Sequence, residues 1–189
     1  MKKFFALMFM AVFLALSTSA FADSRSEVIA PDRVGRWDLG LGVAGGFNDS
    51  VDDSVFVSGT ISYGVTPYIG LGVEAGWQEA DGATGESVGV VPVMADIILR
   101  LPTVHEALVP YGVLGLGVAG VYTELDNQDD VDDTAFAWKL GAGVDYFINP
   151  NWIFNFELAY WSADVDLTRG SVTDGFDWWT VGVALKYVF

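Results

Sequence analysis

The last twelve residues of the chain, 178–189, place a large apolar side chain at every second position. These side chains are Trp179, Val181, Val183, Leu185, Tyr187 and Phe189, and the residues between them are mostly small or polar. Because successive side chains of a β-strand point to opposite faces, the segment is predicted to form a strand with one apolar face. Such a face must be covered by a protein core or by lipid, and the rest of the chain indicates which.

The same alternation recurs in seven earlier segments with turn residues between them, which predicts an all-β chain of eight strands. The predicted apolar series take every second residue from Trp37 to Phe47, Val55 to Tyr63, Ile69 to Trp77, Val93 to Leu99, Leu114 to Val118, Phe136 to Tyr146 and Trp152 to Tyr160. The fifth strand is ambiguous in phase, and there we favour Leu114, Leu116 and Val118 on the apolar face. Small residues and a few charged ones make up the opposite face.

The first 22 residues are predicted to be a secretory signal peptide. Two lysines precede an unbroken apolar run over residues 4–16, and an A-x-A cleavage motif ends at Ala22. A membrane-spanning helix is the alternative, but the run is shorter than the roughly 20 residues that a bilayer requires. No later apolar run is long enough for a helix, so strands must make any membrane crossing. The predicted organisation is a signal peptide over 1–22, a periplasmic linker over 23–35 and a barrel over 36–189.

Composition excludes several classes of function. Removing residues 1–22 takes away two of the nine basic residues and none of the 25 acidic ones, so the mature net charge is 7 − 25 = −18. So acidic a chain offers no basic surface to nucleic acid phosphates. Cysteine is absent, which excludes disulfides and thiolate metal sites. A hydrophobic content of 52% together with 22 glycines suits a barrel that is apolar outside and filled with small side chains inside.

Connection lengths and aromatic positions favour a membrane barrel over a soluble, lipocalin-like one. The predicted connections near 65–67 and 148–151 are short and that near 102–108 is moderate, whereas those after the first, third, fifth and seventh strands are longer and acidic. Outer-membrane barrels combine short periplasmic turns with long external loops, and carry aromatic girdles at both interfaces. One predicted girdle comprises Trp37, Tyr63, Tyr68, Tyr111, Tyr146, Trp152 and Tyr187, and the other Trp77, Tyr122, Trp138, Tyr160, Trp161, Trp178 and Trp179.

Residues 36–189 resemble the small outer-membrane β-barrel family, which includes the OmpA-type transmembrane domain and its porin-like relatives. The resemblance rests on Pro110-Tyr111 followed by Gly115-Leu116-Gly117, on segment 140–146, on Trp152 with Glu157 and Tyr160, and on terminal Phe189. It implies an eight-stranded antiparallel up-and-down barrel in the bacterial outer membrane. It also implies that the barrel-assembly machinery reads the last strand, which assigns Tyr187 and Phe189 to the assembly signal. No peptidoglycan-binding domain follows, so OmpA-like anchoring to the cell wall is not expected.

Eight strands leave an interior that side chains can fill, so charged residues on the inner face must pair with one another. The predicted inward charges are Asp38, Glu74, Asp96, Arg100, Lys139, Asp145, Glu157 and Lys186. We expect the basic residues Arg100, Lys139 and Lys186 to pair with the acidic residues Glu74, Asp96 and Glu157. The favoured interpretation is a network that braces and plugs the barrel. The alternative is a narrow pore for ions or small solutes, which the surplus of acids would make cation-preferring.

Catalysis and metal binding find little support. The one histidine, His105, lies beside Glu106 in a predicted periplasmic turn, so no Ser/His/acid set forms at the external rim, and neither enzyme activity nor a cofactor is expected. The acidic loop over residues 124–133 offers weak candidates for divalent cations, which prefer carboxylate oxygens. The candidates are Asp126, Asp129, Asp130, Asp132 and Asp133. The loop lacks the glycine and terminal glutamate of an EF-hand, and a solvated acidic loop explains the same composition.

The sequence therefore predicts an exported outer-membrane barrel with an occluded, charge-paired lumen. It would act as a structural or surface-interaction protein whose acidic external loops carry whatever specificity exists. The expected partners are outer-membrane lipid, lipopolysaccharide and, during insertion, the barrel-assembly machinery. Divalent cations at the loops are a further candidate partner, and nucleic acid is excluded.

Overall fold

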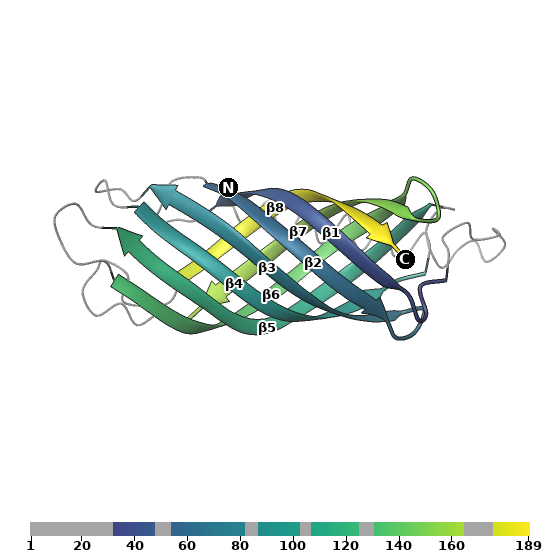
Figure 1. Ribbon diagram of the computed structural model, residues 1–189, viewed down its shortest axis with the longest axis horizontal. Coiled ribbons are helices and arrows are strands. Elements are labelled where there is room, and N and C mark those ends of the chain that lie inside the picture. Colours follow the sequence, from purple (N-terminus) through teal and green to yellow (C-terminus); the bar gives the residue numbers. More distant parts are fainter. Residues whose placement is uncertain (1–31, 48–53, 82–86, 103–106, 125–130, 165–175) are drawn as a thin grey trace.

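The computed structural model describes residues 32–47, 54–81, 87–102, 107–124, 131–164 and 176–189. Its antiparallel strands form a closed barrel in which each strand pairs with the next and β8 pairs with β1 (Figure 1). The strands are β1 (Trp37–Phe47), β2 (Ser54–Gly64), β3 (Ile69–Asp81), β4 (Ser87–Arg100), β5 (Leu108–Glu124), β6 (Val131–Phe147), β7 (Trp152–Ala163) and β8 (Phe176–Val188). The predicted all-β, eight-stranded barrel is confirmed.

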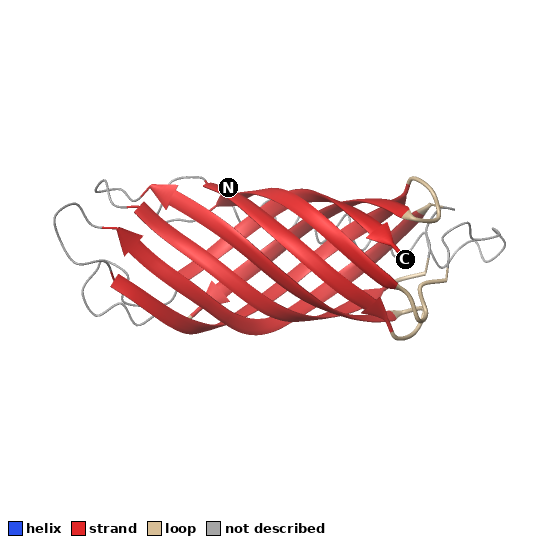
Figure 2. Ribbon diagram, viewed as in Figure 1, coloured by secondary structure: helices blue, strands red, loops and turns tan. Residues whose placement is uncertain are grey.

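Regular structure in the described ranges consists of strands, and turns join them at one end of the barrel (Figure 2). No helix in these ranges is long and apolar enough to cross a membrane. We call the end at which β1 begins and β8 ends the terminal end, and the other the opposite end. The terminal end lies to the right in Figure 1.

The first and last strands close the barrel through a continuous antiparallel ladder. Leu41 stands opposite Leu185 and Val43 opposite Val183, and the ladder continues from Asp38 to Phe47. Because the ladder joins the two ends of the sheet, their backbone groups are paired and no open edge is left. Closure is what allows strands to sit in an apolar environment with their hydrogen bonds satisfied.

The outer face carries the predicted apolar series in every strand. Leu41 is 72% exposed and Leu140 is 57% exposed, and the favoured phase of β5 is confirmed because Leu114, Leu116 and Val118 all face outward. The inner face carries glycine, alanine and the buried polar residues. A protein in water would not leave so many large aliphatic side chains uncovered around its whole circumference. The outer face is therefore suited to lipid.

Three predicted girdle residues face the lumen instead of the membrane. Tyr111, Trp161 and Trp178 are each no more than 2% exposed. The alternation itself explains the error, since Trp161 follows outward-facing Tyr160 and Trp178 precedes outward-facing Trp179. Large rings fill the interior here because glycine and alanine on neighbouring strands leave room for them.

The strands at the opposite end are longer than predicted. Glu124 belongs to β5 and residues 131–133 belong to β6, so only 125–130 of the predicted acidic loop lie between the two strands. The connection after β3 spans 82–86, whereas that after β4 spans 101–107. The connections after β1 and β5, over 48–53 and 125–130, are also shorter than the one after β4, so the prediction that connections after odd-numbered strands are the longer ones is wrong with respect to the connection after β4. The connection after β3 is short because the β3–β4 ladder continues to Asp81 and Ser87.

Residues 32–36, which we call the strap, lie across the terminal end just before β1. Val34 forms a parallel bridge with Gly64, and the Gly35 amide donates to the Gly64 carbonyl at 2.8 Å. Gly35 has a φ of 75°, a conformation that favours glycine. A Cβ at Gly64 would collide with the backbone carbonyl of Arg33. The strap therefore seats closely on the end of β2 and directs Arg33 into the barrel.

Candidate functional site: the barrel lumen

Two regions of different chemistry fill the lumen. The charged region lies toward the terminal end and continues to the middle of the barrel, and the apolar region lies toward the opposite end. The charged region comprises Arg33, Asp38, Glu74, Asp96, Arg100, Lys139, Asp145, Glu157 and Lys186, with the polar residues Ser62, Tyr111 and Asn155. The apolar region comprises Phe56, Val90, Met94, Val121, Trp161 and Trp178.

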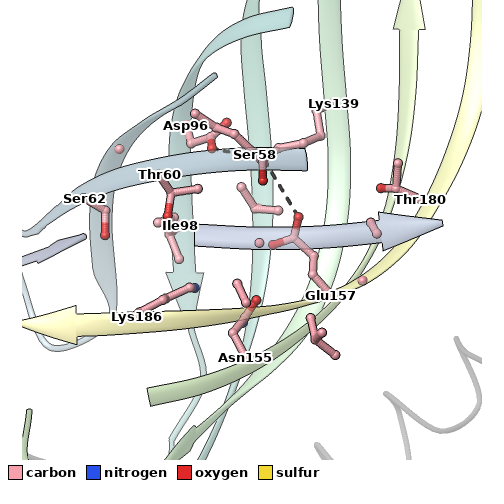
Figure 3. Close-up of a pocket in the computed structure, with 18 of the residues that line it drawn as sticks. Ser58, Thr60, Ser62, Asp96, Ile98, Lys139, Asn155, Glu157, Thr180 and Lys186 are labelled. Atoms are coloured by element: carbon pink, nitrogen blue, oxygen red, sulfur yellow. Dashed lines mark hydrogen bonds and ion pairs between the residues drawn. The ribbon is translucent and has the colours of Figure 1, made fainter. Parts of the chain in front are cut away.

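We call the part of the charged region toward the middle of the barrel its upper part, and the part toward the terminal end its lower part. Lys139 on β6 is the centre of the upper part. Its side chain is 1% exposed, and its ammonium group donates to a carboxylate oxygen of Glu74 and, at 3.0 Å, to Oδ2 of Asp96. Oε1 of Glu157 lies 3.9 Å from the same nitrogen (Figure 3). One buried cation thus faces three carboxylates from three strands, and this group has a net charge of −2 if all are ionised. A side chain at Gly115 would meet Asp96 and Lys139, so glycine there leaves space for the pair.

Tyr111 links the carboxylates of the upper part of the charged region to Asp145 in its lower part. Its hydroxyl donates to Oε2 of Glu157 at 2.5 Å and accepts from Nδ2 of Asn155 at 2.8 Å. Nδ2 of Asn155 also donates to Oδ1 of Asp145 at 2.8 Å. Because hydrogen bonds in a protein interior polarise one another, this chain from Glu157 to Asp145 couples the two groups of charges.

The lower part of the charged region holds two aspartates and three cations. Nη1 of Arg33 donates to Asp145 at 2.8 Å, and Nζ of Lys186 donates to the same carboxylate at 3.2 Å. Asp38 accepts from the Ser62 hydroxyl at 2.6 Å, whereas the guanidinium groups of Arg33 and Arg100 come no closer to it than 3.9 and 3.8 Å. Asp145 is therefore firmly held, and Asp38 is held mainly by Ser62.

The pairing differs from the predicted one in two respects. Lys139 lies among Glu74, Asp96 and Glu157, whereas Lys186 binds Asp145 and Arg100 lies nearest Asp38. These differences follow from strand register, because Asn155 on β7 stands opposite both Asp145 on β6 and Ala184 on β8, which brings Lys186, two residues from Ala184, within reach of Asp145.

Sequence reasoning missed Arg33, which was assigned to a linker. The alternation of apolar and polar residues that locates the strands does not extend to Arg33, because the strap is too short to show a period. A surplus of five predicted inward acids over three cations was the one available sign that another cation enters the lumen.

The apolar region packs rings across the lumen. The ring of Trp161 stacks on Trp178 with centroids 5.5 Å apart and 10° between planes, and meets Phe56 edge to face at 5.3 Å. The indole nitrogen of Trp161 donates to Thr180 at 3.0 Å, so its polar atom is satisfied. Lys139 lies 5.0 Å from the Trp161 ring centroid, which places a cation–π contact at the boundary between the two regions.

A cavity of about 70 Å³ separates parts of the two regions, counted as space for the centres of water molecules. Its wall includes Thr60, Glu74, Asp96, Glu157, Trp161 and Lys186, several of which appear in Figure 3. This volume is enough for several waters, and the polar wall offers them hydrogen bonds. The lumen thus contains space next to both regions, because Phe56 and Trp161 of the apolar region and Tyr111 and Asn155 of the charged region form part of its wall.

The remaining predicted sites fall partly outside the described residues. His105, Asp126, Asp129 and Asp130 lie outside them, and Asp132 and Asp133 belong to strand β6 instead of a loop. Among the described residues, no group of three or more His, Cys, Asp or Glu side chains is arranged to hold a metal ion.

The predicted assembly signal lies at the terminal end. Tyr187 packs edge to face against Trp152 at 5.0 Å and against Phe189 at 5.1 Å. The Phe189 amide donates to the Trp37 carbonyl at 2.9 Å, and the residue is 62% exposed. Recognition of these residues during assembly stays a prediction.

The family described as "Outer membrane protein beta-barrel domain" matches residues 8–189, and the chain belongs to this family. It is an outer-membrane β-barrel protein. The chain is 29% identical over 160 residues to the 31 kDa outer-membrane immunogenic proteins of Brucella melitensis and Brucella suis, covering 78% of this chain and 65% of theirs. It therefore spans less than two thirds of the length of these relatives. The 22 kDa outer membrane protein of Rhizobium leguminosarum is 34% identical over 82 residues, which are 41% of this chain and 38% of that protein.

Solved structures share the fold at low sequence identity. Neisserial surface protein A matches with a TM-score of 0.67 at 13% identity, covering 82% of this chain and 96% of that one. The N-terminal β-barrel domain of OprF from Pseudomonas aeruginosa matches with a TM-score of 0.58 at 17% identity, covering 82% and 98%. Ail, the attachment invasion locus protein of Yersinia pestis, matches with a TM-score of 0.54 at 15% identity, covering 82% and 99%.

Proposed function

We propose that this protein is a non-enzymatic outer-membrane barrel whose lumen is occluded, and that it acts as a structural and surface-interaction protein. The observation that carries the proposal is that buried side chains of two kinds fill the lumen apart from the cavity between them. Buried ion pairs occupy the terminal half, and stacked rings occupy the opposite half. An eight-stranded barrel has little more room than its own inward side chains require.

The opposite end of the barrel is the one we assign to the cell surface. Strands β5 and β6 have 17 residues each, more than the roughly 9–11 residues that cross a bilayer, and they extend at that end (Figure 1). The longest connection, over 164–175, and the acidic segment over 125–130 belong to the same end. In this orientation the strap, the start of β1 and the end of β8 face the periplasm, together with the short turns after β2 and β6, as in outer-membrane barrels with short periplasmic turns.

The name of the Brucella relatives supports display at the surface, because an immunogenic outer-membrane protein presents some of its surface to antibodies. In our proposal the partners of the barrel wall are lipid and lipopolysaccharide. Tyr187 and Phe189 serve as the signal for the barrel-assembly machinery. The carboxylates of residues 124–133 attract divalent cations at the outer leaflet.

A narrow, cation-preferring pore is the second candidate. The polar cavity favours it, since four acidic side chains and two lysines line that space. Conductance separates the two candidates, because a plugged barrel passes no ions and a pore does. The charged region would then have to open, since it obstructs the lumen next to the cavity.

Site-directed labelling tests the proposed orientation. The chain has no cysteine, so single cysteines can be introduced as Asn127→Cys in the connection after β5 and Pro150→Cys in the turn after β6. We expect a membrane-impermeant maleimide to label Asn127→Cys on intact cells and to label Pro150→Cys only after the outer membrane is permeabilised. Labelling in the reverse order would contradict surface display of the opposite end.

A further inference from the structure

The strap contacts both sides of the seam at which β1 pairs with β8. On one side its backbone pairs with β2, because the Gly35 amide donates to the Gly64 carbonyl at 2.8 Å and the Gly64 amide donates to the Arg36 carbonyl at 3.0 Å. On the other side, Nε of Arg36 donates to the main-chain oxygen of Phe189, the residue after β8, at 2.9 Å. The strap therefore connects strands from the two ends of the sheet.

Arg33 extends the contacts of the strap to β6. Its Nη1 donates to Oδ2 of Asp145 at 2.8 Å, and its guanidinium carbon lies 5.2 Å from the centre of the Phe147 ring. Nζ of Lys186, on β8, donates to the same carboxylate at 3.2 Å. Arg33 is buried, so breaking this contact should cost more than breaking an exposed ion pair. A cation that precedes β1 and a cation of β8 thus hold one buried carboxylate together.

These contacts require a closed barrel. Arg33 and Asp145 are 112 residues apart in the sequence, and Arg36 and Phe189 are 153 residues apart. Neighbouring strands lie about 4.8 Å apart, so the first and last strands of an open sheet of this size are separated by roughly 30 Å. No side chain reaches that far. Closure of the sheet must therefore precede docking of the strap on β6 and β8.

We propose that the strap is a latch, which docks after the barrel has closed and then slows its reopening. Contacts that are absent from the transition state of folding lower the rate of unfolding and leave the rate of folding unchanged. The close fit of the Arg33 carbonyl against Gly64 and the turn at Gly35 hold the latch in one docked position. The latch is additional to the proposed surface role, and it acts whether or not the lumen conducts.

The rates of folding into lipid vesicles and of unfolding in denaturant test the latch, with tryptophan fluorescence of the full mature protein as the readout. Arg33→Gln removes the charge from the strap, but Lys186 and Asn155 still bind Asp145, so the barrel should fold. We expect unfolding to be about tenfold faster, the equivalent of one charge-assisted hydrogen bond, and the folding rate to be unchanged. Arg36→Gln should accelerate unfolding about threefold, because its hydrogen bond is exposed.

Thr66→Ala is the matched control at the same end of the barrel. The Thr66 hydroxyl accepts from the amides of Tyr68 and Ile69 within the turn after β2, so the change removes hydrogen bonds and leaves the strap in place. Because contacts within one turn form early, its main effect should be slower folding.

The latch would be disproved if Arg33→Gln slowed folding or did not fold, because the strap would then take part in closure itself. Unchanged unfolding of Arg33→Gln would show that the docked strap does not hold the barrel closed. Equal acceleration of unfolding in Thr66→Ala and Arg33→Gln would also overturn the proposal, since any hydrogen bond lost at this end would then have the same effect.

Discussion

The two halves of the lumen are buried to the same degree but are held by different forces. Lys139 and Trp161 are neighbours and are each 1% exposed. The stability of the ring cluster around Trp161 depends on volume and contact area, which any side chain of similar shape supplies in part. The stability of the group around Lys139 depends on partners, because a buried charge is tolerated only while its counter-charges remain. If the lumen is occluded as we propose, the comparison teaches that one barrel can be closed by two kinds of packing that do not depend on each other.

The largest effect should come from removing the central cation. Lys139→Met keeps most of the side-chain volume but leaves three carboxylates facing one another, so the free energy of unfolding should fall by about 4 kcal/mol. Urea titration of the protein refolded into lipid vesicles measures the change.

A rescue variant sharpens this prediction. Adding Glu74→Gln and Asp96→Asn to Lys139→Met removes two of the three unpaired charges and leaves Glu157, which Tyr111 still contacts, so most of the lost stability should be recovered. Unchanged stability in Lys139→Met alone would show that the ion pairs do not brace the barrel.

The stability of the apolar half should depend on side-chain volume instead of charge. Trp161→Ala removes the stacking on Trp178 and the edge contact with Phe56, and we expect a loss of about 3 kcal/mol in the same titration. Trp161→Phe keeps part of the ring and should lose less than half as much. If removing charges near Lys139 rescued Trp161→Ala, the two regions would not be independent and the comparison would fail.

A smaller effect should follow from cutting the connection between the upper and lower charges. Tyr111→Phe deletes the hydroxyl that donates to Glu157 and accepts from Asn155, at an expected cost of about 1–2 kcal/mol. Tyr146→Phe on the lipid-facing side is the control and should be neutral. A double-mutant cycle with Glu157→Gln should show coupling, and strict additivity would mean that this hydrogen bond contributes nothing.

Much of the fold follows from the sequence, because period-two alternation fixes both the strands and their outward faces. The same alternation predicts that Trp161 and Trp178 point inward. Both were nevertheless assigned to the girdles, because aromatic rings prefer membrane interfaces. Inward positions of Lys139 and Glu74 were predictable for the same reason, whereas the partner of Lys186 was not. Pairing across a barrel depends on register and tilt, which no single strand encodes.

Arg33 could not have been placed from the sequence. Its entry into the lumen depends on the strap turning at Gly35 and seating on Gly64, a contact between segments some thirty residues apart. The continuation of β5 and β6 into the acidic segment was missed because Asp132 and Asp133 interrupt the apolar alternation although the ladder continues through them to Val131. Both errors arise where hydrogen bonding, and not hydrophobic periodicity, determines the structure.

Conductance of the refolded mature protein in planar lipid bilayers, at two or more salt concentrations, tests the occluded lumen most directly. Folding of the inserted protein is verified beforehand by its resistance to heat in detergent. The two-region plug predicts no current steps from folded barrels at any salt concentration. Reproducible, cation-selective steps that grow with salt concentration would contradict it and would make the protein a pore.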